Sequence, residues 1–424
     1  MTLHLLIVPS EVRKRKRKPV SGEVFFTKAA GIAAEYNPFH LGHLRQIERI
    51  RAGFGEDTAV VAVLSGDFVQ RGEAACFSKF ARAEAAVRCG VSLVLELPLP
   101  WCLSSAEGFA RGMMGLLRAA GVIDIISFGS ESADLEAMIR CAEAIDSPEY
   151  PPILREYLTK GISFASARER AVIDIIGKEA AACLRSPNDL LAVEYIRAAG
   201  KEAVYFPVER GGSLHDGAGG ASEIRARMAL GEDWADAVPA PAEAVFRRET
   251  EAGRGPVTGA GLRAALLSRL RERTREDFAR LPDAAEGLES RLFRAARELD
   301  SPEEIAAAAK SRRYALSRLR RMVMCAALGL EKGMADGFPP YLRVLGMDDR
   351  GEALLRRMKK SAALPVIVKS ARILKEDERA RDIFDLTSRA HDLYVLGYGE
   401  AASRRGGEDY RRSPFRLGSD EDPE

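Results

Sequence analysis

The sequence lacks the features that define several large classes of protein. Its six cysteines form no C-x-x-C pair and no short ladder with histidine, which argues against structural zinc and against a disulfide framework. No stretch approaches the ~18 consecutive apolar residues of a membrane span. The basic run near the N-terminus follows only a very short apolar one, the reverse of a secretory signal. We therefore expect reduced thiols, no membrane partner and a cytoplasmic location.

Net charge is also scarce, since 64 basic and 62 acidic residues among 424 leave a formal charge of +2. Nucleic acid would then be attracted only by local clusters of cations. Residues 13–18 are six basic residues in a row, and such runs repel and rarely fold. We expect residues 1–28 to form a basic, disordered extension, with a nucleic-acid-binding arm as the alternative.

Short apolar runs alternate with amphipathic segments between Ala29 and about Leu230. The runs show no polar alternation, as expected for strands buried on both faces. They lie at residues 29–36, 58–66, 91–98, 122–130 and 202–210. Helices are expected at residues 44–52, 79–89, 105–119 and 222–230, with a helical insertion at about 152–199. This β-α-β-α order predicts an α/β fold with a doubly wound, Rossmann-like parallel sheet over residues 29–237.

The second half of the chain has a different character. Residues 238–259 are rich in Pro, Ala and Gly and are expected to form a linker. A mainly α-helical C-terminal region is predicted over residues 260–400, with short apolar runs at 341–347 and 364–370. The polar residues 401–424 are expected to form a loose tail.

The stretch AEYNPFHLGH follows the first predicted strand, where the ligand site of a parallel sheet lies. Pro38 favours an extended Asn37, so the strand ends there. His40 and His43 fall on one face of the first helical turn, which also presents unpaired N–H groups and a positive dipole. Gly42 lets a ligand approach the backbone closely. The pattern indicates a phosphate site.

Two other readings of this histidine pair stay open. A pair three residues apart could ligate a metal, but no third ligand is near in sequence and we predict no metal site. The two rings could also be surface histidines without a role. The apolar strand before the two histidines and the glycine between them favour a nucleotide-binding site.

The H-x-G-H motif after a buried strand resembles the signature of the nucleotidyltransferase and class I aminoacyl-tRNA synthetase superfamily. The segments around it, in one order, are similar to the tRNA(Met) cytidine acetate ligase family over about residues 30–397. They read GIAAEYNPFHLGH, SGDFVQRGEAACFSKFARAEAA, GVSLVLELP, SSAEGFA, FGSE, RSPNDLLAVEY, RGGSLHD, ASEIR, KSRRYALSRLRRM, YLRVLGM and IFDLTSRAHDLY.

This resemblance implies a nucleotidyltransferase-like domain of the HUP type and an ATP-dependent ligase. Acetate and ATP would form acetyl-adenylate with release of pyrophosphate. The acetyl group would pass to N4 of the wobble cytidine, C34, of elongator tRNA(Met), giving N4-acetylcytidine. Mg²⁺ is expected with the ATP phosphates.

The resemblance also implies site residues. ATP would be bound by Ala33, Ala34, Glu35, Tyr36, Asn37, Pro38, Phe39, His40, Leu41, Gly42, His43, Leu44, Arg45, Gln46, Gly129, Asn188, Arg210 and Ser222. The expected catalytic residues are His40, His43, Arg225 and Lys79. For Arg225 a solvated salt bridge is the alternative, and for Lys79 it is an exposed helix start.

Residues 310–321, here called the basic segment, hold six cations and no acid. At helical spacing they would form a stripe suited to RNA phosphates. The predicted tRNA-binding residues are Lys310, Arg312, Arg313, Arg318, Arg320 and Arg321. Tyr314, Tyr341 and Tyr394 are aromatic candidates for stacking on unpaired bases. A merely solvated helix face is the alternative.

Two competing functions remain. An adenylyltransferase acting on a different small molecule would share the H-x-G-H chemistry, although the additional basic helical half disfavours it. A non-catalytic nucleotide- or RNA-binding regulator is the other, and the intact His40, His43 and Arg225 speak against it.

Overall fold

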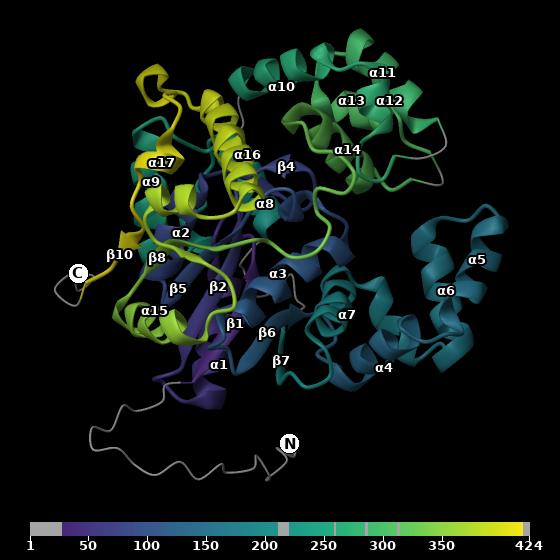
Figure 1. Ribbon diagram of the computed structural model, residues 1–424, viewed down its shortest axis with the longest axis horizontal. Helices are drawn as coiled ribbons and strands as arrows, with labels where there is room; N and C mark the ends of the chain where they lie inside the picture. The colour runs from purple at the N-terminus through teal and green to yellow at the C-terminus, as the bar shows by residue number, and fades with distance from the viewer. Residues whose placement is uncertain (1–27, 211–219, 258–259, 285–286, 312–313, 419–424) are drawn as a thin grey trace.

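The computed structural model describes residues 28–210, 220–257, 260–284, 287–311 and 314–418 (Figure 1). The predicted N-terminal extension, apart from Lys28, lies outside these ranges. The strands are β1 Ala29–Ala34, β2 Ala59–Ser65, β3 Phe68–Val69, β4 Glu73–Ala74, β5 Leu93–Leu97, β6 Ile125–Ser130, β7 Tyr205–Glu209, β8 Leu342–Met347, β9 Val366–Ile367 and β10 Phe415–Arg416. The helices of the first half are α1 Leu41–Phe54, α2 Lys79–Arg88, α3 Ala106–Ala120, α4 Leu135–Ile145, α5 Tyr150–Thr159, α6 Phe164–Ile176, α7 Pro187–Ala199, α8 Ala221–Leu230 and α9 Ala240–Glu251. Those of the second half are α10 Ala260–Glu272, α11 Arg275–Ala279, α12 Leu288–Glu298, α13 Pro302–Ala308, α14 Leu316–Leu328, α15 Asp349–Ser361, α16 Glu378–Tyr394 and α17 Glu408–Arg411.

The main sheet has the order β10-β8-β5-β2-β1-β6-β7, with β9 beside β8. The pairs among β5, β2, β1, β6 and β7 are all parallel, which confirms the predicted doubly wound parallel sheet. The C-terminal part extends this sheet through β8, which runs antiparallel to β5. The helical second half is therefore joined to the first by a shared sheet.

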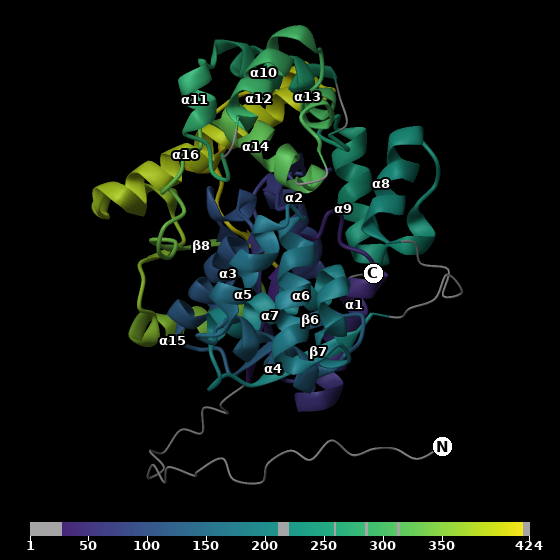
Figure 2. The ribbon, with the colours of Figure 1, turned by 90° about the vertical axis from the view of Figure 1, so that its right-hand side faces the viewer.

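Helices cover both faces of the sheet, as Figures 1 and 2 show. All seven residues of β2 are buried, and the six apolar ones alternate between two apolar clusters. Val60 and Ala62 belong to the cluster with α1, α2, α8 and α9. Val61 and Val63 belong to the cluster with α3, α7 and α15. Burial on both faces explains the absence of polar alternation in this strand.

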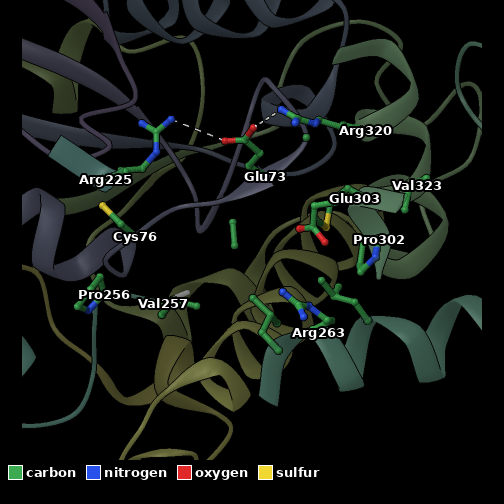
Figure 3. A pocket seen from close by; sticks show the side chains of 15 residues that line it. Glu73, Cys76, Arg225, Pro256, Val257, Arg263, Pro302, Glu303, Arg320 and Val323 are labelled. Carbon is green, nitrogen blue, oxygen red and sulfur yellow. Dashed lines mark hydrogen bonds and ion pairs between the residues drawn. The ribbon is translucent and has the colours of Figure 1, made fainter. Parts of the chain in front are cut away.

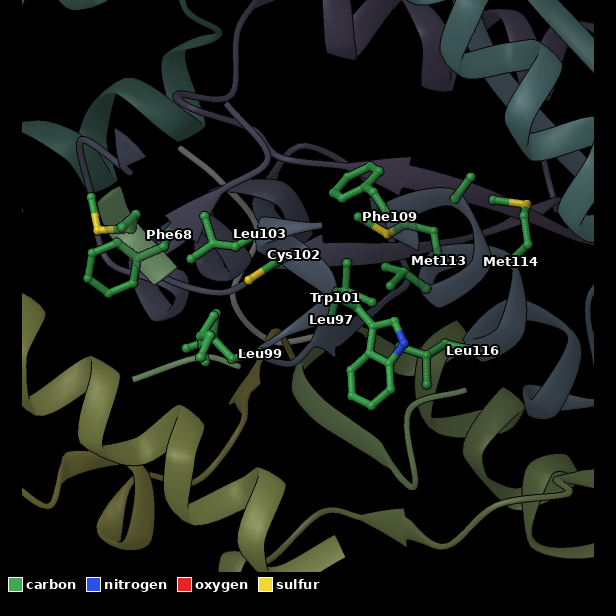
Figure 4. Close-up of a cluster of buried hydrophobic side chains, with 14 of the residues drawn as sticks. Phe68, Leu97, Leu99, Trp101, Cys102, Leu103, Phe109, Met113, Met114 and Leu116 are labelled. Atoms are coloured by element: carbon green, nitrogen blue, oxygen red, sulfur yellow. The ribbon is translucent and has the colours of Figure 1, made fainter. Parts of the chain in front are cut away.

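The second cluster continues from the end of β5 into the C-terminal half (Figure 4). Trp101 is fully buried there beside Phe109 and Met113 of α3. Its indole Nε1 donates to the carbonyl of Gly337, 3.2 Å away. The buried ring of Trp101 packs near α3, and its N–H group binds the segment before β8. Trp101 thus attaches that segment to the α3 region.

The residues between 238 and 259 differ from the predicted linker, because they contain α9. Pro239 lies at the N-cap and Pro241 in the first helical turn, where proline is favoured because the missing N–H would be unpaired anyway. Proline therefore indicated a helix start here and not a loop.

The predicted loose tail is also wrong up to residue 418. Its α17 packs against α16, and Phe415 pairs with Gly346 in the parallel ladder of β10 with β8. Among the described residues, no helix is both long and apolar enough to cross a membrane.

A buried ion network anchors this C-terminal segment. Lys79 Nζ lies 2.7 Å from Glu96 Oε1 and 2.8 Å from Asp409 Oδ2, and all three side chains are fully buried. Arg343 Nη1 pairs with both carboxylates, at 2.9 and 2.8 Å. The expected catalytic role of Lys79 at the ATP rim is thereby corrected, because its ammonium is enclosed by acids inside the fold.

A buried imidazole completes the network. Nδ1 of His391 lies 2.8 Å from Asp67 Oδ2, and its Nε2 lies 2.9 Å from Glu408 Oε2. Burial alone would lower the pKa of His391, but the two carboxylates raise it to about 10. The ring is therefore a cation at neutral pH that joins α16 to the β2 end and to α17.

We expect Asp409→Asn to lower the free energy of unfolding by about 3 kcal/mol, because removing one member leaves Lys79 and Arg343 as undercompensated buried cations. Urea unfolding followed by circular dichroism measures this change. Glu156→Gln is the control, since the pair of Glu156 and Lys160 is largely exposed and should contribute little. Equal stability of the Asp409→Asn and Glu156→Gln proteins would contradict the anchoring role.

Candidate nucleotide-binding site

The candidate site lies where the strand order reverses. From β1 the sheet continues through β2 and β5 in one direction and through β6 and β7 in the other. In open α/β sheets, ligands bind beyond the carboxyl ends of the strands at such a switch point. Most of the predicted ATP residues lie between the end of β1 and the first turns of α1, and Gly129 lies near the end of β6.

The loop after β1 turns sharply into α1. Tyr36 has φ 45°, in the left-handed region, and His40 is the extended N-cap residue with φ −142°. Helix α1 therefore begins at Leu41, three residues before the predicted start. The first turn contains no buried apolar residue, so the periodic apolar pattern begins only after it.

The two histidines cap the helix reciprocally. His40 Nδ1 accepts from the N–H of Gly42 at 3.0 Å, and His43 Nδ1 accepts from the N–H of His40 at 3.2 Å. Their rings stack with centroids 3.8 Å apart. A Cβ on Gly42 would lie 2.8 Å from His40 Cε1, so the glycine makes room for the ring. Since each Nδ1 accepts, a neutral ring carries its proton on Nε2.

Burial keeps both rings neutral. It lowers the pKa of His40 to about 4, with a smaller contribution from the Arg210 cation. The pKa of His43 is lowered well below its usual value by burial, by His40 and by Arg210. His40 Nε2 is buried and has no hydrogen-bond partner among the described residues. An unsatisfied buried donor of this kind fits a phosphate oxygen.

A second group of predicted residues meets beyond β6. Arg210 Nη1 donates to Asn188 Oδ1 at 2.8 Å, and Asn188 Nδ2 donates to Glu131 Oε1 at 2.6 Å. A Cβ on Gly129 would lie 3.2 Å from the Arg210 side chain. Strand β6 pairs with β1, and the Arg210 cation contributes to the lowered pKa of both histidines, so the two groups of predicted residues lie near one another.

Asp189 holds the loop after β6 and was missed by the sequence analysis. It is fully buried and accepts from Ser130 Oγ, from the N–H of Glu131 at 2.9 Å and from the N–H of Ser132 at 3.2 Å. An acid in the first turn of a helix usually faces solvent. In the sequence, the only indication of this role is that Asp189 follows Asn188, a predicted ATP residue.

Arg82 holds the ends of the first two strands and was also missed in this role. Its buried guanidinium donates to four backbone carbonyls, namely Phe77 at 2.9 Å, Glu35 at 2.6 Å, Ser65 at 3.1 Å and Gly66. The guanidinium is therefore occupied by main-chain carbonyls inside the fold.

Helix α8 brings a further cation to the loop after β1. Arg225 Nη1 donates to the carbonyl of Asn37 at 2.7 Å, and its Nη2 donates to Ser222 Oγ at 3.3 Å. The backbone N–H of Cys76 donates to Asn37 Oδ1 at 2.8 Å. Asn37 thus receives bonds from two sides. Residues 211–216 of the RGGSLHD motif lie outside the described ranges.

The basic segment is less free than the sequence indicated. Arg312 and Arg313 lie outside the described residues, and Lys310 is exposed. Arg320 Nη1 lies 2.6 Å from Glu73 Oε1, and Arg321, whose side chain is 11% exposed, pairs with Asp283 at 3.5 Å. Acids from other segments therefore balance part of the stripe.

The aromatic candidates for base stacking also need correction. Tyr341 and Tyr394 are fully buried, and Tyr394 Oη donates to the carbonyl of Ala75 at 2.8 Å. Neither ring can stack on RNA. The guanidinium of Arg318 lies over the Tyr314 ring, 4.8 Å from its centroid, and donates to the carbonyl of Asp283 at 2.6 Å.

Comparison with known proteins identifies the family. The HIGH Nucleotidyl Transferase family model matches residues 27–409. The tRNA(Met) cytidine acetate ligase of Caldanaerobacter subterraneus is 36% identical over 387 residues, covering 88% of this chain and 96% of the relative. The ligase of the same name from Alkaliphilus metalliredigens is 32% identical, covering 91% and 98%.

Solved structures agree in fold. The crystal structure of Thermotoga maritima TmcAL bound with alpha-thio ATP is similar with a TM-score of 0.87 and 33% identity, covering 93% of this chain and 100% of that one. The apo form of the same protein is similar at the same TM-score of 0.87. These likenesses extend over both halves of the chain.

We expect the His40 imidazole to titrate near pH 4, measured by NMR on its ring protons. Because this pKa lies below that of an unfolded histidine, about 6.5, the folded state binds fewer protons between these values. Its contribution to stability is therefore present above pH 6.5 and is lost as the pH falls towards 4. Titration of this ring at pH 6.5 would contradict its burial as a neutral cap.

Proposed function

Because the chain belongs to the tRNA(Met) cytidine acetate ligase family, we propose that it joins acetate to ATP and transfers the acetyl group to N4 of C34 in elongator tRNA(Met). The products would be N4-acetylcytidine, AMP and pyrophosphate. The observation that carries this proposal is the pair of neutral, helix-capping histidines at the switch point of the sheet. Their Nε2–H groups supply donors without adding charge.

In the first step acetate attacks the α-phosphorus of ATP and pyrophosphate leaves. No general base is required, because acetate is ionised at neutral pH. The α-phosphorus gains a fifth oxygen and the phosphates gain negative charge in the transition state. Fixed donors stabilise that state more than ground-state ATP. His40 and His43 would donate from Nε2, with Arg210 and Arg225 as the cations.

The nucleoside end of ATP would lie towards the loop after β6. Gly129 leaves space beside the Arg210 side chain, and Asn188 offers both a donor and an acceptor. Asp189 would act as a positioning residue, since it follows Asn188 in α7 and accepts from the N–H groups of Glu131 and Ser132, in the loop just after Gly129.

Mg²⁺ would accompany the triphosphate. Within the described ranges, no group of three His, Cys, Asp or Glu side chains is placed to hold a metal ion. What this chain supplies is the set of donors around the phosphates.

The helical second half would bind the tRNA. Lys310 is exposed, and Arg318 is stacked on Tyr314 at the start of α14. These cations face no carboxylate among the contacts described above, in contrast to Arg320 and Arg321. They are the better candidates for phosphate contacts.

We expect His40→Asn to reduce acetate-dependent exchange of labelled pyrophosphate into ATP by about 100-fold, the cost of removing one preorganised donor. Asparagine keeps an N-cap acceptor for the helix but lacks the Nε2–H group. The melting temperature should therefore change little, which a thermal scan checks. An exchange rate equal to that of the wild type would refute the role of this ring.

We expect the double variant Lys310→Glu, Arg318→Glu to weaken tRNA binding and to lower its salt dependence by about one counterion for each lost phosphate contact. Pyrophosphate exchange should be unchanged, because neither residue contacts the nucleotide loops. Filter binding at several salt concentrations measures the effect. Affinity and salt dependence equal to those of the wild type would exclude this end of α14 from the RNA interface.

A further inference from the structure

A cavity lies between the nucleotide-binding half and the helical half (Figure 3). Its volume is about 280 Å³, at the lower end for small-molecule sites. One wall comes from the β3–β4 hairpin and α8, and the opposite wall from α10, α13 and α14. The lining is largely apolar, and its charged groups are Glu73, Arg225, Arg263, Glu303 and Arg320.

The cavity shares a wall with the nucleotide site. Cys76 and Arg225 both line it, and both bind Asn37 in the loop before the histidines, at 2.8 and 2.7 Å. A molecule in the cavity would therefore lie one residue layer from the H-x-G-H loop. Its other side would face the helices of the proposed tRNA-binding region.

Glu73 is the central polar group of this cavity. Arg320 Nη1 lies 2.6 Å from one carboxylate oxygen and Arg225 Nη2 lies 3.8 Å from the other, as the dashed lines in Figure 3 show. Its side chain is 32% exposed. A carboxylate has about four acceptor positions, so positions remain for a ligand donor.

The arrangement matches the pairing edge of one nucleobase. Cytosine presents an exocyclic amine, which donates, next to ring N3 and O2, which accept. Carboxylates accept from the cytosine amine, and the flanking arginines offer only donors. Uracil has an acceptor where cytosine has the amine and would oppose the carboxylate of Glu73.

We propose that this cavity receives the acceptor cytosine, and that Glu73 binds its exocyclic amine and takes up its proton during acetyl transfer; this inference rests on the proposed function. The amine lone pair forms the new N–C bond to the acetyl carbon. The C–O bond to the adenylate breaks, and AMP leaves with the electron pair. The proton leaves N4 for the Glu73 carboxylate, so charge and atoms balance.

A proton acceptor is needed for this step because the N4 lone pair is delocalised into the ring and the amine is a weak nucleophile. General-base assistance by a positioned side chain contributes about 10² to 10⁴ in rate. The first step does not need this group, since acetate carries no proton. A substitution of Glu73 should therefore slow acetyl transfer and leave the formation of acetyl-adenylate unchanged.

The test is Glu73→Gln, which keeps the size of the side chain. We expect acetyl transfer from preformed acetyl-adenylate to tRNA to fall by about 100-fold or more. Acetate-dependent pyrophosphate exchange should remain at the wild-type level. Glu304→Gln, in the same helix as Glu303 but outside the cavity lining, is the matched control and should leave both reactions unchanged.

Discrimination between cytosine and uracil is a second measurement. A purely structural role of Glu73 would not affect this discrimination. The wild type should bind an anticodon stem-loop RNA with C34 about tenfold more tightly than one with U34. Glu73→Gln should lose this preference, because an amide can also donate to O4 of uracil. Should Glu73→Gln fail to fold, Glu73→Asp should slow transfer and keep the preference for cytosine.

The outcomes distinguish the two proposals. A wild-type protein without acetate-dependent exchange would overturn the proposed function and this inference with it. Normal exchange together with normal transfer by Glu73→Gln would overturn the inference alone. Equal loss of exchange and transfer would place Glu73 in the nucleotide site and would equally overturn it.

Discussion

The site depends on one buried guanidinium. Arg82 of α2 donates to carbonyls at the ends of β1 and β2 and to Phe77 just before its own helix. Parallel strands end in carbonyls that no further ladder satisfies, and a planar group with five donors can bind several of them at once. The carbonyl of Glu35 is fixed in this way directly before the turn into the histidine loop. Asn37, two residues later, is bound through both its side chain and its main chain.

Given that fixed loop, the choice of imidazole follows from two demands on one residue. A helix N-cap needs an acceptor for the first N–H groups, which Ser, Asp or Asn can supply. A phosphate site at the same turn needs donors and no negative charge. Neutral imidazole meets both, because Nδ1 of His40 accepts from the helix while its Nε2 has no partner among the described residues. Burial and the nearby Arg210 keep the rings neutral, so their donors do not depend on protonation near neutral pH.

The sequence predicted what is local and missed what joins distant segments. The parallel strands follow from patterns within about ten residues, and the H-x-G-H motif lies after the first strand, as expected. Lys79 was assigned a catalytic role because the residues near it in the sequence did not reveal its partner. That partner, Asp409, is 330 positions away. The basic segment contains no acids that balance its charge. Glu73, which pairs with Arg320, is 247 positions away in the sequence. In each case a contact invisible to local patterns decides the outcome.

The β3–β4 hairpin shows how the two halves are coupled. Gly72 has φ 77°, and a Cβ there would overlap the backbone of Arg320 and Arg321, so only glycine allows the hairpin to lie against α14. The next residue, Glu73, contacts cations from both halves, Arg225 of α8 and Arg320 of α14. Because Arg225 also holds the histidine loop through Asn37, the contacts of Glu73 connect α14 with the loop that carries the histidines. Pairing with both cations offsets the free-energy cost of desolvating the Glu73 carboxylate. The carboxylate would become unpaired if the two arginines moved away from it.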